Sequence, residues 1–362
     1  MYFLAKKILF QLDPETAHQT IKNLARLLPP SFFKWGHLVN DKALSCEWGD
    51  IKFNSPIGLA AGFDKNAEMF SWLQNLGFGF IEIGSVTAAP CPGNAKPRIF
   101  RLVKDESLIN RMGLPGSGAD KVEKKLKKVR KKIPVGVNLA KTPVINGQKL
   151  FKGDGIEDFI YSFKKMEKWA DFIVLNLSCP NTNDGKTFED PVLFNELAIS
   201  IKNENKRKCP ILVKLSPDLS LSNLKKLIEL TMSNQFAGFV VSNTTKDRVN
   251  LRTPTSKLEK IGLGGLSGQA LGEKSLKILK ISRDIAGNEP TIIACGGIMN
   301  FNHLIQRFIY GADLCEIYTG FIYNGPAFVS DLNRKLSLFC RKHQLKSFKE
   351  LKGNTDLLKS LV

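Results

Sequence analysis

The stretch Asp171-Phe-Ile-Val-Leu-Asn-Leu-Ser-Cys-Pro-Asn181 joins a short apolar run to an abrupt polar end. Phe172 to Leu175 suits a buried parallel strand, because such strands are almost continuously apolar. Pro180 cannot continue a strand and biases Cys179 toward an extended backbone, so the thiol should lie in a loop. A lone cysteine there is more often a small buried residue than a reactive one. A functional interpretation therefore needs other strands that end in the same way.

Seven more short apolar runs alternate with helical patterns along the chain. The runs are Ile57–Ala61, Phe80–Gly84, Val135–Leu139, Ile211–Leu215, Phe239–Val241, Thr291–Ala294 and Leu314–Tyr318, and helix candidates between them include Ala67–Leu76, Leu221–Met232 and Gly272–Ile285. Eight βα units within one domain predict an α/β fold of the (β/α)8 TIM-barrel type rather than an open sheet. The long connections 86–116 and 244–268 are expected on the C-terminal rim, where catalytic loops belong.

These strands end in polar or small residues, which a barrel would bring together in one cavity. The strand ends are Ala61-Gly62-Phe63-Asp64-Lys65, Gly84-Ser85, Asn138, Asn176, Lys214, Ser242-Asn243-Thr244, Gly296-Gly297 and Tyr318-Thr319-Gly320. The glycine-rich ends of the seventh and eighth strands suit a phosphate group bound by backbone N–H groups. Lys214 could form a Schiff base, an ion pair or a contact with an anionic cofactor. With Lys65 for a substrate carboxylate and one thiol, this set fits flavin mononucleotide (FMN) chemistry.

Composition places the chain among globular proteins. It has 362 residues, of which 43% are hydrophobic, and no apolar run approaches the roughly 20 residues that span a bilayer. No small-residue cleavage site follows an apolar core near the N-terminus, so a secretory signal is not expected. Seven cysteines (46, 91, 179, 209, 295, 315 and 340) are scattered and never spaced as CxxC. This pattern indicates a reducing compartment and predicts neither a disulfide framework nor a metal site.

The formal charge of +19 is concentrated in part in residues 121–132, which hold eight Lys/Arg and one Glu. Val122, Leu126 and Val129 recur at helical spacing, so the lysines would occupy the solvated face of a helix. Such a surface could be only soluble, or it could meet an anionic membrane or a nucleic acid. Charge alone leaves these alternatives open.

Two short amphipathic helices are predicted ahead of the barrel. Residues 3–12 are strongly apolar with two lysines, and Asp13-Pro14-Glu15 is a favourable helix start that leads into a second helix ending at Pro29-Pro30. These helices could pack on the barrel or lie on a membrane. Residues 44–53 are expected to form a hairpin that turns at Trp48-Gly49-Asp50.

Ten motifs together resemble the dihydroorotate dehydrogenase family, in its membrane-associated, quinone-dependent class. They are Leu12-Asp-Pro-Glu-Thr-Ala-His18, Gly58-Leu-Ala-Ala-Gly-Phe-Asp-Lys65, Ile81-Glu-Ile-Gly-Ser85, Pro97-Arg-Ile-Phe-Arg101, Ile109-Asn-Arg-Met-Gly113, Asn176-Leu-Ser-Cys-Pro-Asn181, Val213-Lys-Leu-Ser-Pro-Asp218, Ser242-Asn-Thr-Thr245, Gly264-Gly-Leu-Ser-Gly268 and Ile317-Tyr-Thr-Gly-Phe-Ile-Tyr-Asn-Gly-Pro326. The resemblance implies an FMN-dependent oxidation of dihydroorotate to orotate in pyrimidine (UMP) synthesis, with electrons passed to a membrane quinone. It also implies peripheral attachment to an anionic membrane surface on the cytoplasmic side, and no nucleic-acid partner. The expected organisation is a membrane and quinone-access extension at 1–40, an FMN-binding barrel at 44–343 and a C-terminal tail at 344–362.

The resemblance assigns roles position by position. FMN is expected to bind Ala61, Ser85, Asn138, Asn176, Lys214, Ser242, Gly268, Gly297, Tyr318 and Thr319. Substrate is expected to bind Lys65, Asn110, Arg111, Met112, Gly113, Leu114, Asn176, Asn181, Asn243 and Thr244. Cys179 stands where the family has its general base, which takes the proton from C5 while the hydride leaves C6 for flavin N5. His18, Arg101 and Tyr318 are expected along the quinone path.

Two positions depart from the family pattern. The quinone-dependent class usually has serine at the position of Cys179, whereas cysteine is typical of the soluble class, which lacks the two N-terminal helices. Leu114 replaces a residue that is usually aromatic.

Three other functions fit part of the sequence. A tRNA-dihydrouridine synthase would use the positive charge, an aldolase would use Lys214, and a non-enzymatic membrane-binding barrel would leave the polar strand ends without a purpose.

Overall fold

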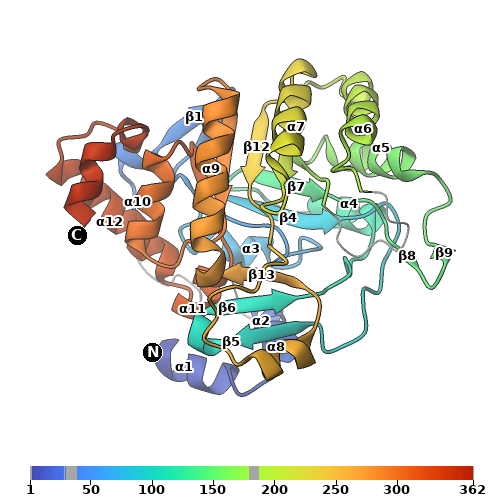
Figure 1. Ribbon diagram of the computed structural model, residues 1–362, viewed down its shortest axis with the longest axis horizontal. Coiled ribbons are helices and arrows are strands. Elements are labelled where there is room, and N and C mark those ends of the chain that lie inside the picture. The colour runs from blue at the N-terminus through green and yellow to red at the C-terminus, as the bar shows by residue number, and fades with distance from the viewer. Residues whose placement is uncertain (1, 28, 30–38, 179–186, 362) are drawn as a thin grey trace.

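Eight parallel strands form a closed barrel, as the sequence predicts (Figure 1). The computed structural model describes residues 2–27, 29, 39–178 and 187–361. The barrel strands are β3 (Ile57–Leu59), β4 (Phe80–Val86), β7 (Val135–Leu139), β10 (Phe172–Asn176), β11 (Ile211–Leu215), β12 (Gly238–Val241), β14 (Thr291–Cys295) and β15 (Leu314–Ile317). They follow one another around the barrel in chain order, and β15 pairs with β3 to close it.

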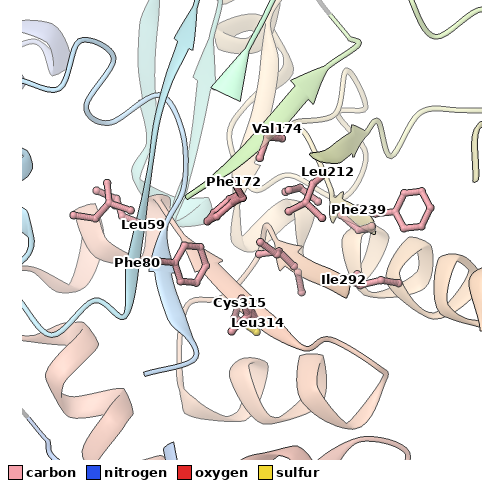
Figure 2. Packing of buried hydrophobic residues seen from close by; sticks show 14 of the residues in the cluster. Leu59, Phe80, Phe172, Val174, Leu212, Phe239, Ile292, Leu314 and Cys315 are labelled. Carbon is pink, nitrogen blue, oxygen red and sulfur yellow. The ribbon is translucent and has the colours of Figure 1, made fainter. Parts of the chain in front are cut away.

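The barrel interior changes from apolar to polar along the strands. Side chains two residues apart in a strand share a face, so Phe80 and Glu82 of β4 lie on the same side, as do Leu212 and Lys214 of β11. Near the N-terminal end, Phe80 and Phe172 meet edge to face with their ring centroids 5.9 Å apart, and Figure 2 shows the two rings pointing toward each other. The polar partners Glu82 and Lys214 occupy the next layer, toward the C-terminal end. The fold thus separates a packed apolar layer at the N-terminal end of the barrel from a polar layer at its C-terminal end.

A hairpin of β1 (Cys46–Trp48) and β2 (Ile51–Phe53) closes the apolar end of the barrel. The Trp48 ring lies 5.7 Å from Phe172 and the Phe53 ring 5.6 Å from Phe80. The predicted hairpin is confirmed. These aromatic contacts pack the N-terminal end of the barrel, and the cavity described below opens at the other end, on the C-terminal rim.

Helices surround the barrel, in the connections between its strands and after the last strand. They are α3 (Phe70–Leu73), α4 (Ala119–Leu126), α5 (Gly155–Met166), α6 (Pro191–Glu204), α7 (Leu221–Ser233), α9 (Gly272–Ala286), α10 (Phe301–Ile309), α11 (Thr319–Asn324) and α12 (Phe328–Lys342). Short 3₁₀ helices cover Lys42–Leu44, Val103–Asp105 and Gln269–Leu271, and a small hairpin pairs β8 (Val144–Ile145) with β9 (Gln148–Lys149).

Two predicted helices are shorter than expected. The helix predicted over Ala67–Leu76 is reduced to α3, because Ala67 has a left-handed backbone (φ 55°) and Asp64 accepts hydrogen bonds from the N–H groups of Glu68 and Met69 instead. The helix predicted over 121–132 ends at Leu126. Val122 and Leu126 are buried as predicted, whereas Val129 packs on the core from beyond the helix.

The two long connections pair with each other on the C-terminal rim. Strands β5 (Ile99–Leu102) and β6 (Ser107–Asn110) come from the first, and β13 (Gly265–Gly268) from the second, together with α8 (Thr255–Ile261). They form a three-stranded antiparallel sheet in the order β13-β6-β5. Figure 1 shows this sheet beside the N-terminal helices, so both insertions help to wall the open end of the barrel.

The N-terminal helices α1 (Tyr2–Leu9) and α2 (Pro14–Leu27) lie at this same end of the molecule (Figure 1). Asp13 caps α2 as predicted, accepting a hydrogen bond of 2.9 Å from the Glu15 N–H. Ion pairs hold α2 to the barrel, from Glu15 to Arg98 at 3.0 Å and from Lys22 to Glu68 at 2.6 Å. Among the described residues, no helix is both long and apolar enough to cross a membrane.

The chain after α12 packs on the barrel. Two 3₁₀ helices, Phe348–Leu351 and Thr355–Leu361, follow α12, and the side chains of Phe348 and Leu351 are buried. The Phe348 ring lies 5.1 Å from that of Phe308 on α10. The segment predicted as a tail at 344–362 thus contributes to the core over its described part.

Candidate functional site

A cavity of about 210 Å³ opens at the C-terminal end of the barrel. Residues at the ends of all eight barrel strands line it, and the insertions contribute the rest. Every residue predicted to bind the cofactor lines this cavity, namely Ala61, Ser85, Asn138, Asn176, Lys214, Ser242, Gly268, Gly297, Tyr318 and Thr319. The structure therefore brings the whole predicted set together.

A row of hydrogen-bonded amides and hydroxyls crosses one wall of the cavity. The Ser85 hydroxyl donates to the Asn138 side chain, and the Asn176 amide donates to Ser85 Oγ at 3.3 Å. Asn243 Nδ2 in turn donates to Asn176 Oδ1 at 3.2 Å and to Ser178 Oγ at 2.7 Å. Because each amide is fixed by its neighbours, the row presents donors and acceptors in set positions to a planar polar ligand.

Lys214 is the buried cation at the floor of this cavity. Its Nζ lies 3.5 Å from Glu82 Oε1, and Glu82 also accepts a hydrogen bond of 2.6 Å from Asn138. Burial is the largest single effect and lowers the Lys214 pKa, but the acidic groups around the lysine, chiefly Glu82, together outweigh burial and raise the pKa above its ordinary value. Lys214 is therefore charged at neutral pH, which disfavours a Schiff-base role and suits contact with an anionic cofactor.

Glycines form a narrow cradle on the opposite wall. Gly297 has φ +72°, and a Cβ added there would lie 2.2 Å from Gly272 Cα. A Cβ added to Gly320 would lie 2.2 Å from the Ile298 carbonyl oxygen. Only backbone fits at both places, so their N–H groups can approach a phosphate closely. This cradle, the amide row and the buried cation fit the phosphate and ring of FMN.

Most of the residues predicted to bind substrate line the same cavity, on the side of the insertions. They are Lys65, Asn110, Met112, Gly113, Leu114, Asn176, Asn243 and Thr244. Lys65 donates to the Gly62 carbonyl at 2.6 Å, and burial lowers its pKa to about 8. Arg111 does not line the cavity, because its guanidinium donates to the carbonyls of Ile261 and Pro97. Cys179 and Asn181 lie outside the described residues.

A second and larger cavity of about 660 Å³ lies between α1, α2 and the barrel. His18, Arg101 and Tyr318, the three residues predicted along a quinone path, all line it. It shares Lys65, Ile99, Leu108, Met112 and Tyr318 with the first cavity. A mostly apolar chamber under the N-terminal helices therefore adjoins the polar site.

His18 packs edge to face on Phe63, with the ring centroids 5.0 Å apart. Burial lowers the His18 pKa from 6.5 to about 4, and the nearby Lys65 adds to this effect. Since an unfolded chain binds the proton more readily, stability should fall as pH drops below 6.5 and the loss should be complete near pH 4.

We expect this loss to reach roughly 3 kcal/mol, at about 1.4 kcal/mol for each unit of pKa shift. The free energy of unfolding, measured with denaturant, should decrease between pH 7 and pH 4 in the wild type. In His18→Gln this decrease should be smaller by about 3 kcal/mol. His343→Gln, at the end of α12, serves as the control. An equal pH dependence in wild type and His18→Gln would contradict the burial argument.

Ser178, Cys295 and Glu316 are among the cavity-lining residues to which sequence reasoning gave no role. Alternation along β15 could have identified Glu316, because it lies two residues after the inward-facing Leu314. Ser178 stood within the quoted motif beside Cys179. Cys295 precedes the Gly296-Gly297 pair, and only closure of the barrel shows that it faces the cavity.

Comparison with known proteins agrees with this geometry. The family model for dihydroorotate dehydrogenase matches residues 43–339. Proteins named dihydroorotate dehydrogenase (quinone) from Christiangramia forsetii and Corynebacterium diphtheriae are 36% and 35% identical; the matches cover 92% and 98% of this chain and 97% of each relative. A crystal structure of DHODH from Eimeria tenella in complex with ferulenol superposes with a TM-score of 0.84 at 29% identity, covering 96% of both chains. The chain therefore belongs to the dihydroorotate dehydrogenase family and is an oxidoreductase.

Proposed function

We propose that the protein oxidises (S)-dihydroorotate to orotate with FMN as its cofactor, and passes the electrons to a membrane quinone. The observation that carries this proposal is the contact between the two cavities. The polar one suits a flavin and a small anionic substrate, and the apolar one suits a lipophilic electron acceptor. Because five residues line both, an acceptor under α2 would come close to a cofactor on Lys214 without displacing the substrate.

The residues of the polar cavity have distinct tasks. FMN, when bound, supplies the hydride acceptor for C6 of the substrate. Lys214 provides a fixed positive charge at the floor, and the glycine cradle holds the phosphate. Lys65 pairs with the substrate carboxylate, while Asn176 and Asn243 orient the substrate ring. Cys179, three residues after Asn176 at the end of β10, removes the C5 proton.

A visible spectrum tests the cofactor and the substrate together. The purified protein should carry a flavin band, and anaerobic addition of dihydroorotate should bleach it within the time of a turnover. Dihydrouridine, which lacks the carboxylate that Lys65 would bind, should not bleach it. A colourless protein that does not take up added FMN, or a flavin band that dihydroorotate leaves unchanged, would refute the proposal.

The exposed face of α1 is suited to a lipid surface. Phe3, Leu4 and Ile8 are each about two-thirds exposed, although large apolar side chains rarely gather in the open. Lys7 lies over the exposed Phe3 ring and is placed to meet anionic headgroups, whereas Lys6 lies over the rings of Phe10 and Tyr323. Peripheral binding through this helix would bring the apolar cavity to the membrane and open it to quinone.

Substitution of Phe3, Leu4 and Ile8 by serine should separate the two half-reactions. Bleaching by dihydroorotate should stay normal, whereas liposome binding and reoxidation by a long-chain quinone should each fall about tenfold or more, because the apolar anchor is lost. Val192, Ile199 and Leu221 are also exposed but lie on α6 and α7, away from α1 (Figure 1). Their replacement by serine is the matched control and should change neither quantity. Unchanged liposome binding in the α1 variant would exclude this helix as the anchor.

A further inference from the structure

Four titratable side chains from four different strands meet at the floor of the polar cavity. Glu82 comes from β4, Lys214 from β11, Cys295 from β14 and Glu316 from β15. Both glutamates are fully buried, and Lys214 is 6% exposed. Glu316 is in register with Cys295 on the neighbouring strand β14, and Glu82 is the charged group that acts most strongly on it. The other strand beside β15, β3, contributes only Ile57–Leu59 and therefore no charge.

The charges in this cluster do not balance if both glutamates are ionised. Among the described residues Lys214 is the cation in contact, and it already pairs with Glu82 at 3.5 Å. Two adjacent carboxylates facing one buried ammonium would leave an uncompensated negative charge out of water, which is strongly unfavourable. One of the two glutamates should therefore hold a proton.

The hydrogen bonds identify which glutamate holds it. Glu82 Oε1 accepts from Asn138 Nδ2 at 2.6 Å and faces Lys214, so Glu82 has the partners of an ionised group. Glu82 Oε2 and both oxygens of Glu316 are buried and receive no hydrogen bond from a protein donor. A proton on Glu316 that points to Glu82 would satisfy Glu82 Oε2 and would turn the repulsion between the carboxyl groups into a hydrogen bond.

We propose that Glu316 is protonated at neutral pH and donates a hydrogen bond to Glu82, so that the cluster carries one negative charge against Lys214. Glu316 is then a positioning residue: it fixes the Glu82 carboxylate, and through it the lysine that faces the cofactor. Burial and the Glu82 carboxylate both raise the Glu316 pKa well above its usual range, in agreement with the geometry. The inference rests on the proposed function only in taking the ligand above Lys214 to be a flavin.

The protonated acid should be visible without any cofactor. Infrared spectra of the apoprotein at neutral pH should contain the carbonyl stretch of a buried carboxylic acid, and this band should be absent from Glu316→Gln. In Glu82→Gln it should also be lost, because Glu316 would then be the sole counter-charge of Lys214 and would ionise. Asp158→Asn, at another buried acid whose pKa burial raises, is the matched control and should keep the band. A band that persists in Glu316→Gln or Glu82→Gln would overturn the proposal.

The flavin potential provides a readout that a purely structural role would not change. Glutamine mimics the neutral acid, so Glu316→Gln should match the wild type at neutral pH. As the pH rises through the raised pKa of Glu316, the wild type should begin to bind one additional proton for every two electrons that the flavin accepts. Glu316→Gln should not bind this proton. If the reduction potential of the flavin changed with pH in the same way in the wild type and in Glu316→Gln, the proposal would be overturned. A protein that binds no flavin would refute the proposed function instead, and would leave the infrared result to decide the state of Glu316.

Discussion

Replacement of Cys179 by alanine should slow the bleaching of bound flavin by dihydroorotate by about 10²-fold or more, the usual contribution of a positioned base. Cys179 itself lies outside the described residues, and the last described residue before it is Ser178. Ser178 Oγ accepts a hydrogen bond from Asn243, whose amide also reaches Asn176 on the wall of the cavity. Ser178, which precedes Cys179 in the sequence, therefore lies at the polar site.

The identity of the base can be tested with a second thiol and a conservative change. Cys295 also lines the cavity, but burial raises its pKa to about 12, so it is a poor base at neutral pH. Cys295→Ala should therefore slow reduction by a far smaller factor than Cys179→Ala. Cys179→Ser should retain activity with its optimum moved to higher pH, because a hydroxyl is less acidic than a thiol whose pKa is near 8.5. Stopped-flow reduction rates from pH 6 to 10 would check both, and normal reduction in flavin-loaded Cys179→Ala would exclude the role.

The barrel was predictable because its signal is local. Each predicted strand is a short apolar run with a polar end, and all eight became barrel strands. The sheet on the rim was not predicted, because its pairing joins distant segments, as in the register of Gly265 with Asn110. Local periodicity does not show which loops meet. The short α3 was missed for a related reason, since the Asp64 side chain replaces helical hydrogen bonds that the sequence pattern alone would favour.

The residues expected to contact the cofactor were more predictable than the buried residues that hold them in place. The family resemblance assigned the ten cofactor positions, and because all of them except Gly268 stand at the ends of barrel strands, closure of the barrel brings them to one cavity. Glu82 was not identified, because one acid within an apolar strand resembles a solvent-exposed position. Only closure of the barrel places it against Lys214 on the far strand. Arg111 illustrates the opposite case: it belongs to a quoted motif, yet it follows Asn110 at the end of β6 and its side chain points to Ile261.

Lys214→Ala should weaken FMN binding and slow flavin reduction by roughly 10²- to 10³-fold even when FMN is in excess, the usual loss when one preorganised charge or donor is removed. The reason is electrostatic. A hydride adds negative charge to the cofactor, and a cation held by Glu82 in a partly desolvated site stabilises that charge without having to reorganise. Flavin occupancy after dialysis and anaerobic stopped-flow reduction would measure the two effects.

Lys65→Ala is the matched comparison, because Lys65 is the other lysine that lines the polar cavity. Its loss should raise the dihydroorotate concentration needed for half-maximal reduction while flavin occupancy stays near that of the wild type, since Lys65 lies on the substrate side and donates to the Gly62 carbonyl. The two substitutions should thus have different effects. Lys214→Ala should weaken cofactor binding and slow flavin reduction, whereas Lys65→Ala should lower the affinity for substrate. If Lys214→Ala kept both its flavin and its reduction rate, the buried lysine would serve only to neutralise Glu82, and the charge that drives reduction would have to come from elsewhere in the site.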